Sequence, residues 1–487
     1  MRAPGKSKGR IAAPGISARL SGHVMLGAQP DGSITADIDG YSIGLGKFSA
    51  GVTERAQALR VGLPFDSFLS HGHADDEEVE RLVRLLAQRG LLEYGLSALD
   101  DGKDQVVIEP QIPDYWPRTP ELGNDDVVAL SRFAYLRRRG NEMVLESPRA
   151  GALFKICDPR VAATLATLSA PHTIKQLHKQ EGFPGVTLLA LLLDCQILFK
   201  IEAAGNDGLR VNEGDDNLVL WDFHDLLFHT RSTEGRQANP LGGLYTYADV
   251  VAPRPAVRPP WPGKVIELRE ISSQPAGTIS PLANLLRQRH STREFDDGQP
   301  VTLAELSQFL DGTARVLSKW KSEVDLGEGG PVVDYTSRPY PSGGSEYELE
   351  LYLSVANCEG LARGFYHYDA DRHALVSIAV RDQELDAQFA ATEFAMGTAA
   401  TPQILITIAA RFDRVSWKYS GIAYSLILKD VGALMQTFYL MATEMGLGGC
   451  AVGTNNIDLF ARMTGVEFHI EGPVGQFALG RGAKLGG

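Results

Sequence analysis

Two proline-rich stretches divide the chain and limit what it can fold into. The first, IEPQIPDYWPRTPELG, spans residues 108–123, and the second, APRPAVRPPWPG, spans residues 252–263. Proline-rich segments of this kind are typical of semi-rigid connectors between domains. The chain has 487 residues, which is more than one domain usually contains. We therefore expect about three domains, with boundaries at these two stretches.

The segment before the first stretch begins with short strands and continues with helices. Residues 23–46, HVMLGAQPDGSITADIDGYSIGLG, predict a β-meander or hairpin with Asp-Gly turns at 31–32 and 39–40. One helix is predicted at residues 52–59. A second begins near residue 75, has acids in its first turn and ends at Gly90, and LLEYGL at residues 91–96 predicts a closing strand.

The segment after the first stretch repeats this order of elements. Residues 141–156 predict strands, residues 158–169 and 173–180 predict helices, and residues 185–202 predict a helix that leads into a strand. Two successive strand-helix-helix-strand units indicate tandem winged-helix-like domains. We place them at residues 18–105 and 130–215, followed by a connector at 216–265 and a larger domain at 266–487.

The charge of the chain argues against nucleic acid as a partner. The formal net charge is -13 at pH 7, from 47 Lys and Arg residues against 60 Asp and Glu residues. A general polyanion binder needs a net or local basic surface. The basic run LRRRG at residues 136–140 keeps a DNA-binding regulator open as a minor alternative. We expect no nucleic-acid partner.

Cysteine usage and the N-terminus indicate the compartment. The cysteines are scattered and form no CxxC pair; they are Cys157, Cys195, Cys358 and Cys450. Neither a metal site nor a disulfide framework is indicated, and a reducing cytoplasm fits best. The N-terminus, MRAPGKSKGRIAAPG, is basic but lacks the apolar core of a signal peptide, and no run of about 18 apolar residues occurs. We expect a soluble protein without a membrane partner.

The larger domain has the pattern of an α+β mixture. Residues 302–316 predict a capped amphipathic helix, residues 347–358 a strand with alternating faces, and residues 364–378 a hairpin. The longest helical pattern covers residues 423–449 and is ended by the glycine-rich sequence GLGGCAVGTN. Its wide apolar stripe consists of Ile427, Val431, Leu434, Met435, Phe438 and Met441.

Four segments of this domain are candidates for ligand binding. QRHSTREFDD at residues 288–297 is dense in donors and follows SPLANLLR, whose Leu282, Leu285 and Leu286 predict one buried helix face. Cations at the end of that helix can also simply complement its dipole. The PSGG turn at 341–344 and GLGGCAVG at 446–453 lack bulky side chains, so their backbone can approach a flat ligand, and FALGRGAK at 477–484 places an arginine beside glycines.

The sequence RHSTREF at residues 289–295 resembles the opening motif of the FMN-dependent nitroreductase superfamily. In that family such residues hold the flavin phosphate and ribityl chain, which suits the charge-assisted contacts of guanidinium groups. PSGGSEYELELYL, GFYHYDADRHAL and KYSGIAYSLILKDVGALMQTFYLMATEMGLGGCAVG resemble, in order and spacing, the SagB-type azoline oxidases of thiazole- and oxazole-containing peptide pathways, which include cyanobactin oxidases.

The resemblance implies a nitroreductase-like fold with FMN as the cofactor, and it assigns site residues by position. Contacts to the flavin phosphate and ribityl chain would come from Arg289, His290, Ser291 and Arg293. The turn that contacts the flavin would be Pro341, Ser342, Gly343 and Gly344. The segment near the isoalloxazine would be Gly448, Gly449, Cys450 and Ala451. A further phosphate ligand would be Arg481.

The resemblance also implies a catalytic pair. Lys418 and Tyr419 stand where azoline oxidases carry a Lys-Tyr pair, between the predicted strand at 403–411 and the long helix. Oxidation of an azoline removes a proton from the ring carbon next to the carbonyl and transfers a hydride from the ring to the flavin. The proton needs a base. Desolvation or a neighbouring cation could lower the lysine pKa, and a tyrosinate could serve equally. Alternative bases are His229, His367 and His469.

Partners follow from the same resemblance. It implies an azoline-containing precursor peptide and a homodimer, and dioxygen as the final electron acceptor because no GxGxxG fingerprint follows a strand. The N-terminal units resemble peptide-clamp or leader-recognition modules, which bind a leader peptide by strand addition; a purely architectural role is equally open. Two further alternatives are an NAD(P)H-dependent nitroreductase or flavin reductase, and a non-catalytic peptide-binding scaffold.

Overall fold

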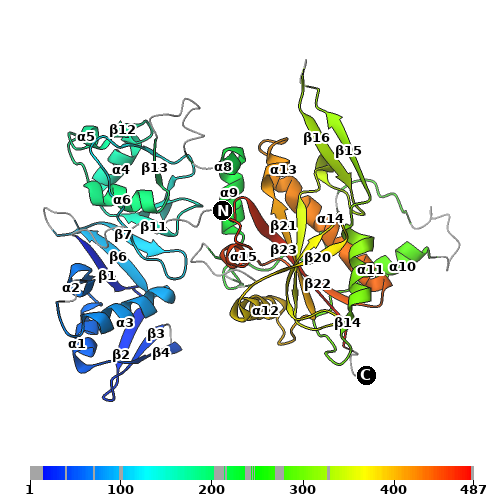
Figure 1. Ribbon diagram of the computed structural model, residues 1–487, viewed down its shortest axis with the longest axis horizontal. Helices are drawn as coiled ribbons and strands as arrows, with labels where there is room; N and C mark the ends of the chain where they lie inside the picture. Colours follow the sequence, from blue (N-terminus) through cyan, green and yellow to red (C-terminus); the bar gives the residue numbers. More distant parts are fainter. Residues whose placement is uncertain are drawn as a thin grey trace. The chain divides into compact units, whose positions relative to one another are not determined.

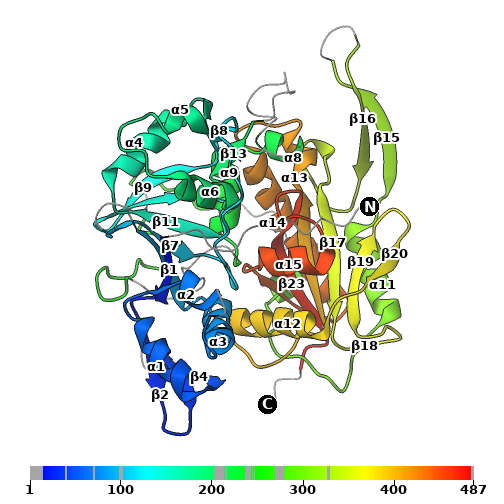
Figure 2. The same ribbon diagram turned by 60° about the vertical axis from the view of Figure 1, so that its left-hand side comes forward.

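The computed structural model of the chain describes residues 15–38, 41–69, 72–97, 102–201, 213, 216–235, 243, 245, 247–260, 262–268, 279–325 and 329–483. The chain divides into two compact units, Met1–Asn239 and Pro240–Gly487. Both units combine helices with strands (Figures 1 and 2), so the predicted α+β class is confirmed.

A seven-stranded antiparallel sheet organises the N-terminal unit. In spatial order its strands are β5 (Leu63–Pro64), β1 (Ile16–Leu20), β6 (Leu92–Ser97), β7 (Asp104–Pro110), β11 (Ala152–Ile156), β10 (Glu142–Glu146) and β9 (Tyr135–Arg139). Strand β7 pairs with β6 on one side and β11 on the other. The sheet therefore runs through both of the repeated segments.

The elements predicted for the first segment are present. Strands β2 (Val24–Ala28), β3 (Ser33–Ile38) and β4 (Tyr41–Lys47) form the expected meander. Gly32 occupies its first turn with φ 82°, and the second turn, at 39–40, lies outside the described residues. Helices α1 (Ala50–Ala58), α2 (Asp66–Leu69) and α3 (Asp76–Gln88) follow, and Gly90 after α3 has φ 66°, a backbone conformation that glycine adopts at low cost.

The second segment also has the predicted order. Asp158 caps α4 (Pro159–Thr167), α5 (Ile174–Leu177) and α6 (Val186–Asp194) follow, and strands β12 (His172–Thr173), β8 (Val127–Leu130) and β13 (Leu198–Lys200) form a small sheet. Helices α8 (Asp216–Leu220) and α9 (Phe223–Arg231) complete the unit. The winged-helix likeness and the domain boundaries remain predictions.

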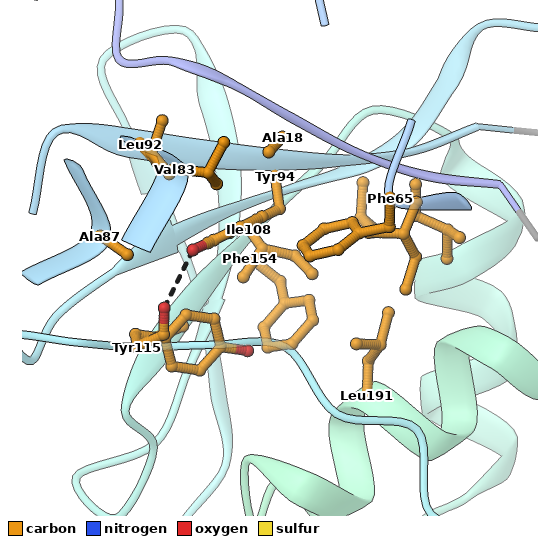
Figure 3. Close-up of a cluster of buried hydrophobic side chains, with 14 of the residues drawn as sticks. Ala18, Phe65, Val83, Ala87, Leu92, Tyr94, Ile108, Tyr115, Phe154 and Leu191 are labelled. Atoms are coloured by element: carbon orange, nitrogen blue, oxygen red, sulfur yellow. Dashed lines mark hydrogen bonds between the residues drawn. The ribbon is translucent and has the colours of Figure 1, made fainter. Parts of the chain in front are cut away.

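One hydrophobic core joins the two segments. Figure 3 shows Phe65 and Tyr94 of the first segment packed with Phe154 and Leu191 of the second. Tyr115, from the first proline-rich stretch, is buried in the same cluster and its carbonyl accepts a hydrogen bond of 2.9 Å from the Tyr94 hydroxyl. That stretch was expected to be a connector, but its aromatic residue is part of the core.

The basic run at 136–140 lies on β9, beside carboxylates. Arg137 pairs with Glu146 at 2.6 Å, and Arg139 pairs with Glu109 at 2.8 Å. Cations that are already paired with carboxylates offer little to a phosphate backbone. The contacts therefore favour a solvated, charge-balanced face here.

A six-stranded antiparallel sheet forms the centre of the C-terminal unit. In spatial order its strands are β20 (Ala374–Ile378), β19 (Gly364–Asp369), β17 (Leu349–Val355), β21 (Ile404–Arg411), β23 (Glu471–Gly480) and β22 (Gly448–Val452). The predicted strand at 347–358 and hairpin at 364–378 correspond to β17, β19 and β20.

Helices cover both faces of this sheet (Figures 1 and 2). Adjacent residues of a strand point to opposite faces. Phe477 of β23 packs against Phe438 of α14 (Ala423–Glu444), with ring centroids 5.3 Å apart. Its neighbour Ala478 joins a cluster with Phe389 of α12 (Asp382–Met396) and Phe460 of α15 (Ile457–Thr464). The capped helix predicted at 302–316 is α11 (Leu303–Ala314), which packs beside α14.

The predicted burial of one helix face is wrong for a single copy of the chain. Helix α10 (Pro281–Gln288) forms where expected, but it contains no buried residue, and Leu282 and Leu286 are 57% and 48% exposed. The apolar spacing is real and Leu285 is half-buried, yet Leu282 and Leu286 stay exposed in the described unit. By contrast, the stripe of α14 is buried as predicted at Ile427, Val431 and Phe438.

The remaining elements of this unit are short. They are β14 (Val301–Thr302), the hairpin strands β15 (Ser318–Glu323) and β16 (Val332–Ser337), the 3-10 turn Gly343–Ser345, β18 (Cys358–Glu359) and α13 (Phe412–Ser416). None of the helices among the described residues combines the length and apolarity that a membrane crossing requires.

Candidate active site

The donor-rich segment lies against the glycine-rich strand β22. Helix α10 ends at Arg289, and from there the backbone N–H of Thr292 donates to the Gly449 carbonyl at 2.8 Å. A Cβ added at Gly448 would lie 2.5 Å from the Thr292 side chain, which is too close for any larger residue without a shift. Two segments far apart in the sequence are thereby joined.

Tyr439 of α14 ties these two segments together. Its hydroxyl makes a hydrogen bond of 2.9 Å with the Ser291 hydroxyl and accepts one of 2.8 Å from the Ala451 N–H. The Arg289 guanidinium lies 5.0 Å from the centre of its ring, within cation–π range. Cys450 turns its side chain into the core, and burial raises its pKa. No sequence pattern pointed to Tyr439 as a site residue.

The cations predicted to hold a phosphate differ in their partners. Within the described residues, neither Arg289 nor Arg293 forms an ion pair, and Arg293 is exposed. His290 is exposed too, and its Nδ1 lies 3.0 Å from the Gln288 carbonyl. Arg481 contacts both carboxylate oxygens of Glu305 at 2.7 and 2.9 Å. Arg481 is therefore already neutralised by the protein, and the other two arginines are not.

The PSGG segment forms a strained turn before β17. Gly344 has φ 66°, and the nearby Ser345 and Tyr347 have positive φ although they carry side chains, which costs free energy and is common at functional sites. The Gly343 N–H donates to Oδ2 of Asp430 at 2.9 Å, and the Ser342 hydroxyl accepts from the Tyr347 N–H at 3.0 Å. Pro341 enters this turn, and α14 holds it from one side.

The predicted catalytic pair meets this turn. Lys418 and Tyr419 lie between α13 and α14, and Nζ of Lys418 donates to the Gly344 carbonyl at 3.1 Å. A Cβ added at Gly344 would lie 2.4 Å from the Tyr419 hydroxyl and 2.7 Å from Nζ of Lys418. The structure therefore brings the Lys-Tyr pair onto the turn that was predicted to contact a flavin.

Glu346 determines the state of the lysine. Nζ of Lys418 lies 2.9 Å from its carboxylate, which is 3% exposed and also lies 3.2 Å from Arg414. Burial lowers the pKa of Lys418, but the hydrogen bond and charge of Glu346 outweigh it and raise the pKa above its usual value. The expectation of a lowered lysine pKa is therefore wrong, because a buried carboxylate lies beside the amine.

Two further acids lie beneath the turn. Glu348 is 0% exposed and lies 3.4 Å from the Ser342 hydroxyl, and its other oxygen has no hydrogen-bond partner among the described residues. Burial, with the nearby Asp430, raises the pKa of Glu348 to about 7. Burial also raises the pKa of Asp430. Asp430 is an acid beside the apolar stripe of the long helix, and that unusual position could have marked it as a candidate from the sequence.

The three histidines offered as alternative bases have other roles. His229 is fully buried and stacks on Trp221 with centroids 5.9 Å apart. Nε2 of His367 lies 3.2 Å from Glu350, whose hydrogen bond raises the His367 pKa. His469 is buried against the edge of Phe468. Packing or an ion pair accounts for each.

Comparison with known proteins identifies the family. A protein of Methanocaldococcus jannaschii named as a nitroreductase is 31% identical over 172 residues, which cover 35% of this chain and 78% of that protein. The chain belongs to the nitroreductase family. The nitroreductase family model matches residues 286–481, a range that contains every site residue predicted from Arg289 to Arg481. The resemblance to this superfamily is confirmed, and the chain is a nitroreductase-family oxidoreductase.

The N-terminal unit has a match of its own. The family model described as cyanobactin oxidase ThcOx matches residues 128–238, which run from β8 to beyond α9. The nitroreductase domain is thus preceded by a segment that is similar to part of a cyanobactin oxidase. This agrees with the narrower resemblance drawn from the C-terminal segments.

Solved structures match part of this chain at low sequence identity. A nitroreductase from Ralstonia eutropha is 24% identical, covers 44% of this chain and 88% of its own, and has a TM-score of 0.32. A chain of the E. coli microcin synthetase complex with truncated pro-MccB17 bound is 18% identical, covers 54% of this chain and 96% of its own, and has a TM-score of 0.38. A nitroreductase from Desulfovibrio desulfuricans in complex with FMN is 16% identical, covers 43% of this chain and 91% of its own, and has a TM-score of 0.27.

Proposed function

We propose that this nitroreductase-family protein is an FMN-dependent azoline oxidase that converts peptidyl thiazolines or oxazolines to thiazoles or oxazoles. The observation that carries the proposal is the meeting of Lys418, Tyr419 and Gly344. A proton-transferring pair beside a ligand-binding turn suits proton abstraction next to a hydride acceptor. A reductase that reacts only with a soluble nicotinamide has no evident need for such a pair.

The residues fit FMN in chemistry and in spacing. Arg289 and Arg293, unpaired among the described residues, suit a phosphate. Asp430, beneath the PSGG turn, and Tyr439, beside the arginines, are nine positions apart on α14, which corresponds to about 13 Å. An elongated ligand with an anionic end and a flat end suits two such clusters. Arg481 is already paired with Glu305, so it would contribute less to phosphate binding than the two unpaired arginines.

In this proposal the chain's residues handle the proton. FMN, when bound, would supply the acceptor for the hydride from the azoline ring. Lys418, paired with Glu346, is protonated at neutral pH and acts first as a cation that stabilises negative charge growing on the substrate. It can accept a proton only after it has given up one of its own, and the Glu346 carboxylate opposes that loss. The Tyr419 phenol, beside the same turn, would be the alternative base: it would release its own proton to solvent and then take the substrate proton, so both residues remain catalytic candidates.

Partners and acceptor belong to the same proposal. The match of residues 128–238 to a cyanobactin oxidase model supports a precursor peptide as substrate and the N-terminal unit as a leader-binding or architectural module. The exposed Leu282 and Leu286 of α10 would be covered in a homodimer. Dioxygen would be the final electron acceptor. The compartment would be a reducing cytoplasm, because the four cysteines are unpaired thiols.

The test is oxidation of a defined peptide. The purified protein, loaded with FMN, is incubated aerobically with a thiazoline-containing peptide, and mass spectrometry is used to detect the loss of two hydrogen atoms together with peroxide formation. Lys418→Ala and Tyr419→Phe should each slow turnover by about a hundredfold or more while FMN remains bound. Unchanged turnover in both variants would remove the proton-transfer assignment.

A second candidate is an NAD(P)H-dependent nitroreductase or flavin reductase. The relative named as a nitroreductase favours it. Rapid anaerobic bleaching of bound flavin by NADH or NADPH, without oxidation of thiazoline peptides, would identify this activity. A purified protein that takes up no flavin would instead indicate a non-catalytic peptide-binding scaffold.

A further inference from the structure

The hairpin β15–β16 has two chemically different faces. Side chains on paired strands alternate between faces, and the register pairs Ser318 with Ser337 and Glu323 with Val332. The residues of one face are all uncharged: Ser318, Trp320, Ser322, Val333, Tyr335 and Ser337. The residues of the other face are mostly charged: Lys319, Lys321, Glu323, Val332, Asp334 and Thr336. The charged face is thus suited to water and ions, and the uncharged face to a neutral partner.

An aromatic pair lies at the centre of the uncharged face. Trp320 and Tyr335 are direct cross-strand partners, and their rings stack with centroids 5.7 Å apart and planes 17° apart. Trp320 is 43% exposed. A two-stranded hairpin is only marginally stable in water by itself, and this stack adds to the cross-strand contacts that stabilise it, such as the Ser318–Ser337 hydrogen bond. The indole is therefore held against Tyr335 while part of its surface stays open to a ligand.

The stack continues directly into the Lys418 site. Nζ of Lys418 lies 5.4 Å from the centre of the Tyr335 ring. Together with the 5.7 Å between the two rings, Trp320 can lie at most about 11 Å from the lysine amine. Since an extended chain advances about 3.3–3.6 Å per residue, this upper limit corresponds to at most about three residues of a bound peptide.

We propose that the Trp320–Tyr335 pair is a subsite for a flat, uncharged ring of the substrate peptide, at most about three residues from the azoline presented to Lys418 and Tyr419. The proposal rests on the proposed function and names how the peptide is held. A flat ring stacks on an indole face without needing hydrogen bonds or charge. The ring is either an azole that has already been formed or an aromatic side chain, and the experiment separates these sources.

The experiment uses the full-length protein loaded with FMN and three thiazoline peptides. They carry a thiazole, a phenylalanine or an alanine three residues from the thiazoline. For the wild type, kcat/KM should be about fivefold to tenfold higher with a ring than with alanine. Trp320→Ala should abolish this difference and Trp320→Phe should keep most of it. Lys321→Ala, on the opposite face of the same strand, should leave it intact.

A binding measurement decides the proposal without turnover. Calorimetry with a peptide that contains only finished thiazoles should give a Kd about fivefold to tenfold weaker for Trp320→Ala than for the wild type, at equal FMN content and equal melting temperature. A gain with one ring alone supports the subsite and identifies the ring. Equal kcat/KM for all three peptides, with oxidation intact, overturns the subsite but not the proposed function. Absence of oxidation overturns the proposed function, and the calorimetry then decides the subsite.

Discussion

The two ends of the site along α14 treat their cations in opposite ways. Near Tyr439, Arg289 and Arg293 have no carboxylate partner among the described residues. Near Asp430, Lys418 shares the buried carboxylate of Glu346 with a second cation, Arg414. Unpaired cations suit an anion that comes from outside the protein. Paired cations are held in place before any ligand binds, which is what a reacting group requires.

The same contrast extends to the glycines. At the Tyr439 end, Gly448 makes room for Thr292 and so brings two binding segments together. At the other end, Gly344 makes room for the Lys418 amine and the Tyr419 hydroxyl. In the proposed site, one glycine would serve binding and the other would serve the placement of reacting groups. Changing each in turn should separate the two functions.

The largest effect is expected for Gly344→Ala. Its added methyl would collide with the Tyr419 hydroxyl at 2.4 Å, at a residue with φ 66°. Displacement of reacting groups by about 1 Å can cost about a hundredfold in rate, so kcat measured at saturating FMN should fall at least that far. Gly448→Ala should instead weaken FMN binding first, which a fluorescence titration measures.

A matched control for both variants is Gly432→Ala. Gly432 lies in the middle of α14, and a Cβ there would meet nothing within 4 Å. Alanine is favoured over glycine in a helix by up to about 1 kcal/mol, so this variant should keep full activity and melt slightly later. If Gly344→Ala also kept full activity, the contact between the turn and the Lys-Tyr pair would have no catalytic role.

The next effect concerns stability, through Glu348. Its folded-state pKa of about 7 lies above its ordinary value of 4.5, so the folded chain keeps this proton while the unfolded chain releases it. The free energy of unfolding therefore falls as pH rises from about 4.5 to about 7, by up to about 3 kcal/mol. Glu348→Gln should match the wild type near pH 5 and be more stable at pH 8.

Denaturant unfolding across this pH range measures that difference. Glu359→Gln, which changes an exposed carboxyl of the same domain, serves as the control and should follow the wild type at every pH. A Glu348→Gln variant that is less stable than the wild type at pH 8 would mean that the carboxylate makes an essential contact in its charged form.

Local patterns in the sequence predicted most elements of the fold. The capping box of Thr302 and Glu305 places α11, and the acids and Gly90 bound α3. These signals act over a few residues, so periodicity and capping rules detect them. The α14 stripe and the placement of Lys418 after a strand are of the same kind.

The parts that sequence reasoning missed depend on contacts between distant residues. Glu346 meets Lys418 across 72 positions, and Tyr439 meets Ser291 across 148. No periodicity encodes such pairs, so the direction of the Lys418 pKa was predicted wrongly. For the same reason, Tyr115 was placed in a connector although it packs into the core, and the apolar spacing of α10 could not reveal that a single copy of the chain leaves it exposed.

A smaller effect should distinguish the arginines. Arg293→Gln and Arg289→Gln each remove an unpaired cation and should weaken FMN binding about tenfold, the value of one charge-assisted hydrogen bond. Arg481→Gln breaks the pair with Glu305, which also caps α11, so it should lower the melting temperature more than it weakens FMN binding. Equal losses of FMN affinity in all three would contradict the division into paired and unpaired cations.

The smallest effect tests how Glu346 prepares the lysine. Glu346→Gln removes the carboxylate that raises the Lys418 pKa, while burial, which lowers it, remains. If Lys418 accepts the substrate proton, the acidic limb of the kcat profile should move to lower pH, with plateau turnover within about threefold of wild type. Arg414→Gln breaks the other contact of Glu346 but keeps its charge beside Lys418, so its acidic limb should not move down. An unchanged acidic limb in Glu346→Gln, at unchanged melting temperature, would assign the proton to Tyr419 and leave Lys418 as the fixed cation.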